Sequence, residues 1–158
     1  KVSMHMEDVK LKELMGELHE EMSLQTKPGQ NIMLDYKEDE EYLWMDGALI
    51  RNSLTNLLSN AIKYSPEGSE ITLKALVEGE KIVLAVQDQG IGIPYEEQEH
   101  LFERFFRAKN VIHIKGTGLG LSIVKRYIDM LGGKISFHSV PNEGTSFTIH
   151  LRKTKPKQ

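Results

Sequence analysis

The stretch Asn56-Leu57-Leu58-Ser59-Asn60-Ala61-Ile62-Lys63-Tyr64 presents two chemically different faces at helical spacing. Residues three and four apart are neighbours on a helix, so the leucines and Ala61 continue an apolar stripe, while Asn52, Asn56, Asn60 and Lys63 share another face. A solvated surface is the ordinary interpretation of a polar face. Asparagine, however, suits a helix interior poorly, because its side chain competes for backbone hydrogen bonds. Three asparagines at four-residue spacing therefore point to a ligand.

That ligand can be a magnesium ion that also touches phosphates. A carboxamide oxygen is a neutral, hard ligand of the kind that magnesium accepts. Lys63 follows Asn60 by about one turn and supplies a positive charge for phosphate oxygens. The face is thus typical of a nucleotide site.

A second motif, Asp88-Gln89-Gly90-Ile91-Gly92-Ile93, follows an alternating apolar run. Asp88 continues the two-residue register of Val86, so strand geometry aims it into the layer between sheet and helices, where an unpaired carboxylate is costly. It can sit in the following turn, which Gly90 allows. It can also accept a hydrogen bond from the exocyclic amine of adenine, with Gly90 and Gly92 letting the backbone approach the base. Both interpretations stay open.

A third motif, Gly116-Thr117-Gly118-Leu119-Gly120-Leu121, opens a predicted helix, whose free N–H groups favour anions. It does not follow a buried strand in a βαβ unit, and no acidic residue stands at the ribose position, which excludes the usual dinucleotide fold. A P-loop is excluded because no Gly-Lys-Ser/Thr follows. A fourth motif, Gly144-Thr145, precedes the last apolar run.

Composition fits one soluble domain of 158 residues, with 39% hydrophobic and 27% charged residues. A net charge of −3 gives no bulk attraction to nucleic acid or membrane. The absence of cysteine excludes disulfides and thiolate metal sites and fits a reducing compartment. No apolar run is long enough to cross a bilayer. Because the chain starts at Lys1 rather than Met, we expect a piece of a longer protein, which can carry membrane segments.

The element pattern predicts an α+β fold: a two-layer α/β sandwich with a mixed, mostly antiparallel sheet covered on one face by helices. Asp8 and Asp46 are predicted N-caps, and the basic residues 152–158 are expected to form a disordered tail after a domain of residues 1–151. The elements follow hydrophobic periodicity and turn residues. Strands are predicted near residues 2–6, 32–35, 41–45, 71–77, 82–88, 134–138 and 145–151, and helices near 9–22, 47–64, 96–106 and 118–131.

Taken in order, these motifs closely resemble the catalytic and ATP-binding domain of bacterial two-component sensor histidine kinases, which has the Bergerat fold. Residues 56–64 resemble the N box, 88–93 the first glycine box, 102–107 the F box, 116–121 the second glycine box and 144–145 the last one. The resemblance covers about residues 2–151.

The resemblance implies a role for each matching position, with ATP and Mg²⁺ as cofactors. Asn60 and Asn56 would bind magnesium, and Lys63 and Arg107 would face the phosphates, so that Arg107, Lys63 and Asn56 form the catalytic set. Tyr64 would flank the base, Asp88 would hold the adenine amine and Thr145 would support Asp88. The other implied cofactor-binding residues are Gly90, Gly92, Ile93, Gly116, Thr117, Gly118, Leu119, Gly120 and Leu121. Phe102, Phe105 and Phe106 would anchor a lid or a partner domain, or else pack in the core.

Asn56 distinguishes between reactions within this fold. The gyrase, mismatch-repair and chaperone ATPases carry a glutamate at this position as general base for water, and anti-sigma-factor serine kinases also tend to carry an acid there. Asparagine cannot accept a proton at neutral pH. We therefore expect poor hydrolysis and transfer to an already nucleophilic imidazole, which makes the chain an incomplete protein-histidine kinase. A nucleotide-binding regulatory module and an ATPase are the alternatives.

The acceptor histidine itself is not recognisable in this sequence. His19-Glu20 lacks the basic residue and the proline that follow His-Glu in the family, so His19 is predicted to lie on a helix surface. No other histidine has the spacing of a metal site. The expected partners are the helical dimerisation and phosphoacceptor domain of the same parent protein and a response regulator receiver domain. We expect no nucleic acid and no direct membrane contact, a monomeric isolated domain and a cytoplasmic location.

Overall fold

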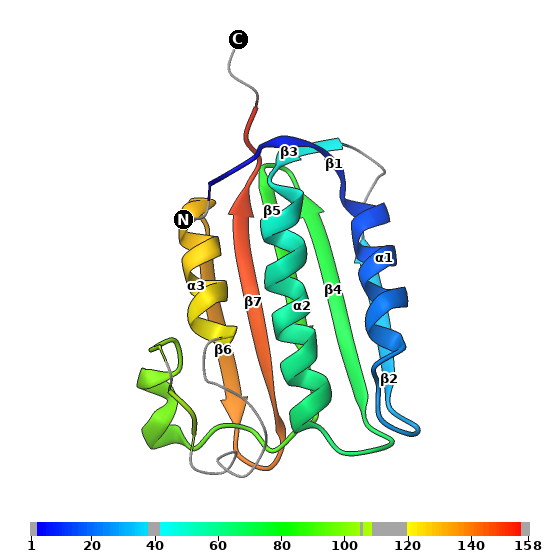
Figure 1. Cartoon of the computed structure of the whole chain (residues 1–158), viewed down its shortest axis with the longest axis vertical. Coiled ribbons are helices and arrows are strands. Elements are labelled where there is room, and N and C mark those ends of the chain that lie inside the picture. Colours follow the sequence, from blue (N-terminus) through cyan, green and yellow to red (C-terminus); the bar gives the residue numbers. More distant parts are fainter. Residues whose placement is uncertain (1–2, 38–41, 105, 109–119, 156–158) are drawn as a thin grey trace.

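Three helices cover one face of a five-stranded sheet whose strand order is β2-β4-β5-β7-β6 (Figure 1). The computed structural model describes residues 3–37, 42–104, 106–108 and 120–155. β2 runs parallel to β4 and the other pairs are antiparallel, so the predicted two-layer α+β fold is confirmed. The helices are α1 (Leu11–Ser23), α2 (Gly47–Tyr64), α3 (Gly120–Met130) and the 3₁₀ helix η1 (Tyr95–His100). The strands are β1 (Glu7–Lys10), β2 (Asn31–Lys37), β3 (Tyr42–Met45), β4 (Glu70–Glu78), β5 (Lys81–Gln87), β6 (Lys134–Val140) and β7 (Gly144–Arg152).

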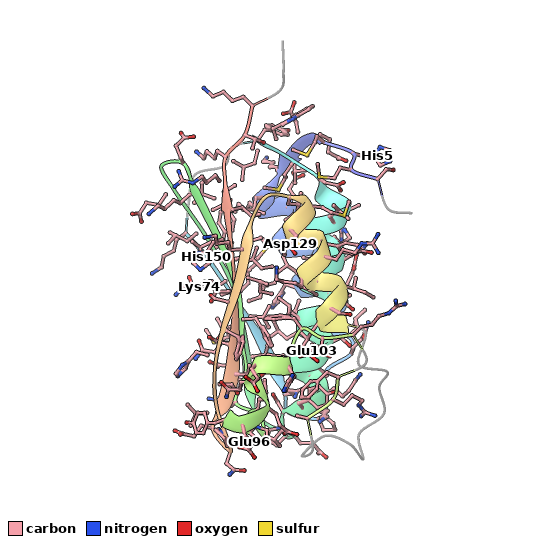
Figure 2. All side chains as sticks on the ribbon, turned by 90° about the vertical axis from the view of Figure 1, so that its left-hand side faces the viewer. His5, Lys74, Glu96, Glu103, Asp129 and His150 are labelled. Atoms are coloured by element: carbon pink, nitrogen blue, oxygen red, sulfur yellow. The ribbon has the colours of Figure 1, made fainter. Side chains whose placement is uncertain are left out.

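The sheet has one apolar and one polar face because its strands alternate. In β4, Ile71 and Leu73 are fully buried against the helices, whereas Lys74 is exposed. Figure 2 shows Lys74 and His150 on the face without helices, and Asp129 of α3 on the other side. Each fully buried leucine or isoleucine contributes about 1.5–3 kcal/mol. The core therefore lies in a single layer between the sheet and the helices.

α2 is the central helix, and both of its ends are fixed by side chains from other segments. Asp46 caps the N-terminus as predicted, with Oδ1 accepting from the Leu49 amide at 3.0 Å. At the C-terminus, the ammonium group of Lys27 donates to the carbonyls of Lys63 and Ser65 at 2.9 and 2.7 Å. These carbonyls have no partner within the helix, so the lysine supplies the missing donors and suits the negative end of the helix dipole.

The first predicted strand and the Asp8 cap are wrong. Asp8 lies inside β1, and α1 begins after Lys10 without a side-chain cap. β1 pairs with β3, which places Val9 opposite Leu43 and buries both. This pairing bridges distant parts of the chain, so local alternation could not reveal it.

The C-terminal boundary also lies later than expected. Arg152 belongs to β7, and the Lys153 amide donates to the Glu80 carbonyl at 2.8 Å. Thr154 Oγ1 then donates to the carbonyl of Trp44 at 3.1 Å. Residues 152–154 are thus held by backbone pairing and hydrogen bonds, and 156–158 lie outside the described residues. None of the helices within the described ranges is both long and apolar enough to cross a bilayer.

Candidate functional site

The polar face of α2 lies beside the start of α3. Asn56 and Asn60 are half-buried, whereas Asn52 is exposed. A Cβ atom on Gly120 would lie 3.9 Å from Asn56 Oδ1, so the end of the second glycine motif borders the asparagine face. Neither Asn56 nor Asn60 makes a hydrogen bond to another described residue. Their carboxamides are therefore available to a ligand. Gly116 to Leu119 lie outside the described residues, and Leu121 packs against the core.

Asp88 occupies the predicted turn and leaves one carboxylate oxygen open. Its Oδ1 accepts hydrogen bonds from the amides of Gly90, at 2.8 Å, and Thr145, at 3.1 Å, which is the predicted turn. Thr145 supports Asp88 through its backbone, as its carbonyl also accepts from the Asp88 amide at 2.8 Å. Oδ2 receives no hydrogen bond within the described ranges. Burial raises the pKa of Asp88, although the two amides act in the opposite direction. A desolvated carboxyl with one open oxygen is suited to bind a donor.

The glycines after Asp88 are required by neighbouring protein backbone. A Cβ on Gly90 would come within 2.4 Å of the Tyr64 carbonyl oxygen. Gly92 has φ +69°, and its Cβ would come within 2.3 Å of the Val140 carbonyl oxygen. Left-handed backbone at such close contact leaves room only for glycine. Whether this backbone also approaches a base stays a prediction.

A cavity of about 390 Å³ lies at the C-terminal end of α2. It brings together three predicted residues, Lys63, Tyr64 and Gly90, but Asn56 and Asp88 do not line it. The lysine ammonium lies 5.8 Å from the centre of the Tyr64 ring. The remaining lining residues are Lys27, Ser65, Pro66, Gln89, Ile91 and Asn142. The sequence did not assign these six residues to the site, because side chains in turns and loops carry no periodic signal.

Arg107 lies near the tyrosine at this end of α2. Burial raises the pKa of Tyr64, and the charge of Arg107 partly offsets that increase. The charge at the end of the F box therefore acts on Tyr64. Phe102 packs against the rings of Phe137 and Phe147, with centroids 5.8 and 6.4 Å apart, so core packing is confirmed for this residue.

Other predicted positions have simpler outcomes. Phe106 lies against His100, with ring centroids 5.8 Å apart, while Phe105 is outside the described residues. His19 is half-buried, and its Nε2 lies 2.7 Å from the Ile32 carbonyl oxygen, so the predicted surface position is wrong and the side chain joins α1 to β2. Within the described ranges, no cluster of three or more histidine, aspartate or glutamate side chains could hold a metal ion.

Ser139 and Gln98 are polar residues beside the Asp88 loop that sequence analysis missed. Ser139 is 2% exposed, and its Oγ lies 2.8 Å from Thr145 Oγ1. A signal was present, because Ser139 continues the two-residue register of the half-buried Ile135 and Phe137. A hydroxyl on an apolar row requires partners, just as a carboxylate does.

Comparison with known families decides the identity of the fold. Residues 45–155 match the model of the family described as "Histidine kinase-, DNA gyrase B-, and HSP90-like ATPase". This chain belongs to that family. Within the family, it groups with the ATP-binding domains of sensor histidine kinases, as the following similarities show.

Curated relatives of this kinase domain are sensor kinases. The adaptive-response sensory kinase SasA of Crocosphaera subtropica is 38% identical over 152 residues, which cover 95% of this chain and 40% of the relative. The sensor histidine kinase WalK of Bacillus subtilis is 41% identical over 114 residues, covering 70% of this chain and 19% of the relative. The chain thus spans less than half of the length of these relatives.

Solved structures agree with the fold of the kinase domain. The catalytic domain of histidine kinase ThkA superposes with a TM-score of 0.84 at 30% identity, covering 96% of this chain and all of that one. The mycobacterial sensor histidine kinase MprB gives a TM-score of 0.81 at 27% identity, covering 93% of this chain and 98% of that chain. The predicted family and the nucleotide class, ATP, are therefore confirmed, while the individual site residues remain predictions.

Proposed function

We propose that this domain binds Mg-ATP and transfers the γ-phosphoryl group to a histidine on a separate helical domain. The observation that carries the proposal is a set of open hard oxygens on α2 and at the end of β5, two elements that pack against each other. Asn56 and Asn60 on α2 and Oδ2 of Asp88 at the end of β5 accept no hydrogen bond from the described residues. These oxygens are partly exposed and unpaired among the described residues, so a polar ligand can reach and bind them.

The two asparagines fit magnesium through their chemistry. A carboxamide oxygen is a hard, neutral ligand, and magnesium bound to a triphosphate takes only one or two protein ligands. When bound, the ion neutralises charge on the phosphate oxygens. Asn60 and Asn56 would hold it, and the N-terminus of α3 with the loop 116–121 would bind phosphate oxygens.

The base would be recognised at Asp88. Oδ2 of Asp88 can accept a hydrogen bond from the exocyclic amine of adenine, because Oδ1 is already held by two amides. Tyr64 is half-buried at the end of α2 and would flank the base. Gly92 and Ile93 would complete this wall.

The transfer step needs positioning and charge stabilisation rather than a base on this chain. The acceptor imidazole nitrogen supplies its lone pair to phosphorus, the bond from phosphorus to the bridging oxygen breaks, and its electron pair leaves with ADP. Arg107 can brace the terminal phosphate bidentately as charge redistributes, and Lys63 adds a second cation. Asn56 cannot take a proton from water, so hydrolysis is not promoted. The phosphohistidine would then donate its phosphoryl group to the receiver domain of a response regulator.

Labelled ATP mixed with a separately expressed helical phosphoacceptor domain tests the proposal. We expect acid-labile label on the acceptor only when this chain and magnesium are present, and no label on the chain alone. Phosphate release by the chain alone at about 1 per second or more would favour an ATPase. Tight ATP binding without transfer would favour a regulatory module.

Arg107→Ala refines the same experiment. Because the guanidinium should act mainly in the transition state, we expect most ATP affinity to remain and transfer to fall about a hundredfold. Arg104→Ala is the matched control, since this arginine is exposed three residues earlier. Near-normal transfer by Arg107→Ala would show that Arg107 is a surface arginine without a role in the transfer step.

A further inference from the structure

A buried hydroxyl holds the two segments between which Asp88 lies. Ser139 Oγ accepts from the Ile93 amide at 2.9 Å, at the end of the loop that Asp88 begins. The same oxygen lies 2.8 Å from Oγ1 of Thr145 and 3.3 Å from the carbonyl of Gly144. Thr145 in turn donates its amide to Asp88 Oδ1 at 3.1 Å. One hydroxyl thus joins the end of the Asp88 loop, at Ile93, to Thr145, whose amide binds the carboxylate.

A second side chain closes the network from η1. The amide group of Gln98 donates to the carbonyl of Ile93 at 3.0 Å and to the carbonyl of Ser139 at 3.1 Å. Ile93 is therefore held at its N–H by Ser139 and at its C=O by Gln98. We call Gln98, Ile93, Ser139, Thr145 and Asp88 the Ser139 network.

We propose that Ser139 and Gln98 are positioning residues that fix the direction in which Asp88 presents its open oxygen, and that they thereby set selectivity for a 6-aminopurine nucleotide. This inference rests on the proposed function. A hydrogen bond to the base weakens steeply when its angle is poor, so the carboxylate must be held in one orientation. Satisfied buried networks provide such rigidity, and sites need supporting contacts behind the group that touches the ligand.

Gln98 gives the network a second connection. η1 ends at His100, directly before the F box that carries Arg107. The amide of Gln98 therefore links the base-recognition loop to the segment leading to the phosphate end of the proposed site. Substitution of Gln98 should affect base recognition although its amide donates to Ile93 and Ser139 and not to Asp88.

The test compares ATP with purine riboside triphosphate, which lacks the 6-amino group. For Ser139→Ala and Gln98→Ala we expect ATP affinity by calorimetry to fall about tenfold, as for one hydrogen bond of a network, and the affinity for the amine-free analogue to stay unchanged. In an Asp88→Asn background, neither substitution should weaken ATP further, because coupled groups are not additive. Ser136→Ala on the exposed side of β6 and Glu96→Gln on η1 are the matched controls.

Three outcomes would overturn the inference. Equal losses for both nucleotides would show a merely structural role, and thermal melts identify any variant that loses its fold. Gln98 is half-buried, so Gln98→Ala keeps the test open if Ser139→Ala is unstable. If Asp88→Asn weakens ATP while both variants bind like wild type, only this inference fails. If Asp88→Asn leaves ATP affinity unchanged, the proposed base contact fails with it.

Discussion

Two aspartates at opposite ends of α2 differ in how completely their oxygens are used. Asp46, 2% exposed, accepts from the amide of Leu49 on Oδ1, at 3.0 Å, and from that of His5 on Oδ2, at 2.7 Å. Asp88, whose loop reaches α2 through the bond from the Ile91 amide to the Tyr64 carbonyl, uses Oδ1 alone. An acid whose two oxygens each bind a backbone amide acts as a structural cap, whereas an acid with one open oxygen leaves a position for a ligand.

Ionisation of Asp88 carries a cost in the folded protein. Burial raises the pKa of Asp88, so the folded protein disfavours its charged form. A raised acid pKa means that this penalty is absent below the unfolded pKa and complete above the folded one. At neutral pH, the charged form of Asp88 therefore lowers the stability of the fold relative to its neutral form, as expected of a residue retained for binding.

The largest effect is expected for Asp88→Asn. ATP affinity should fall about a hundredfold, because the amide can present a donor to the adenine amine in place of a charged acceptor. The thermal midpoint at neutral pH should be unchanged or higher, since Oδ1 can still accept from Gly90 and Thr145 without the ionisation penalty. Calorimetry and a thermal melt measure both, and unchanged affinity in a folded variant would remove Asp88 from the site.

Asp46→Ala should give the opposite pattern. The free energy of unfolding should fall by about 2 kcal/mol, because a helix cap is lost and the amides of Leu49 and His5 lose their partner. The folded fraction should bind ATP with normal affinity. Urea denaturation and calorimetry measure the two quantities, with Asp46→Asn as the control that keeps an acceptor. A loss of affinity without loss of stability would contradict the assignment of a structural role.

Asn60→Ala tests whether the other open oxygens serve the metal. We expect the affinity for Mg-ATP to fall about tenfold and that for adenosine to remain, because the carboxamide would touch only the ion. Asn52→Ala, two turns earlier on the same face and exposed, is the matched control. If the affinities for Mg-ATP and adenosine fell by the same factor, Asn60 would have a structural role or contact the base.

The smallest effect is expected from pH. ATP affinity should fall a few-fold on acidification as Asp88 becomes protonated, because the neutral acid is a weaker acceptor. The midpoint should lie above the ordinary aspartate value of about 3.9, since burial raises this pKa. Asp88→Asn removes this group, so its affinity should lack that titration. An identical pH profile in the variant would assign the titration to another group.

The sequence predicted the parts of this molecule in which side-chain type conflicts with position. Periodicity located the helices and hairpins. Asn56 and Asn60 stood out because asparagine suits a helix interior poorly, and Asp88 because a polar group continued an apolar register. β1 was misplaced because its pairing with β3 is not local. Lys27 and Gln98 were missed because the carbonyls that they bind are brought to them only by the folded structure. Ser139, in contrast, carried the same polar-on-apolar signal as Asp88 and could have been found.

The pairing of β5 with β7 has a consequence for folding order. The two hairpins, β4–β5 and β6–β7, close over short turns, but the register of β5 with β7 joins Gln87 to Ser146 across α3. Closing a long loop is entropically expensive, so this pairing should form late. Asp88 and Thr145 meet just beyond it. A chain in which only the two hairpins have formed contains all the motifs but lacks the contact between Asp88 and Thr145. ATP would therefore bind to, and stabilise, only molecules whose sheet is complete.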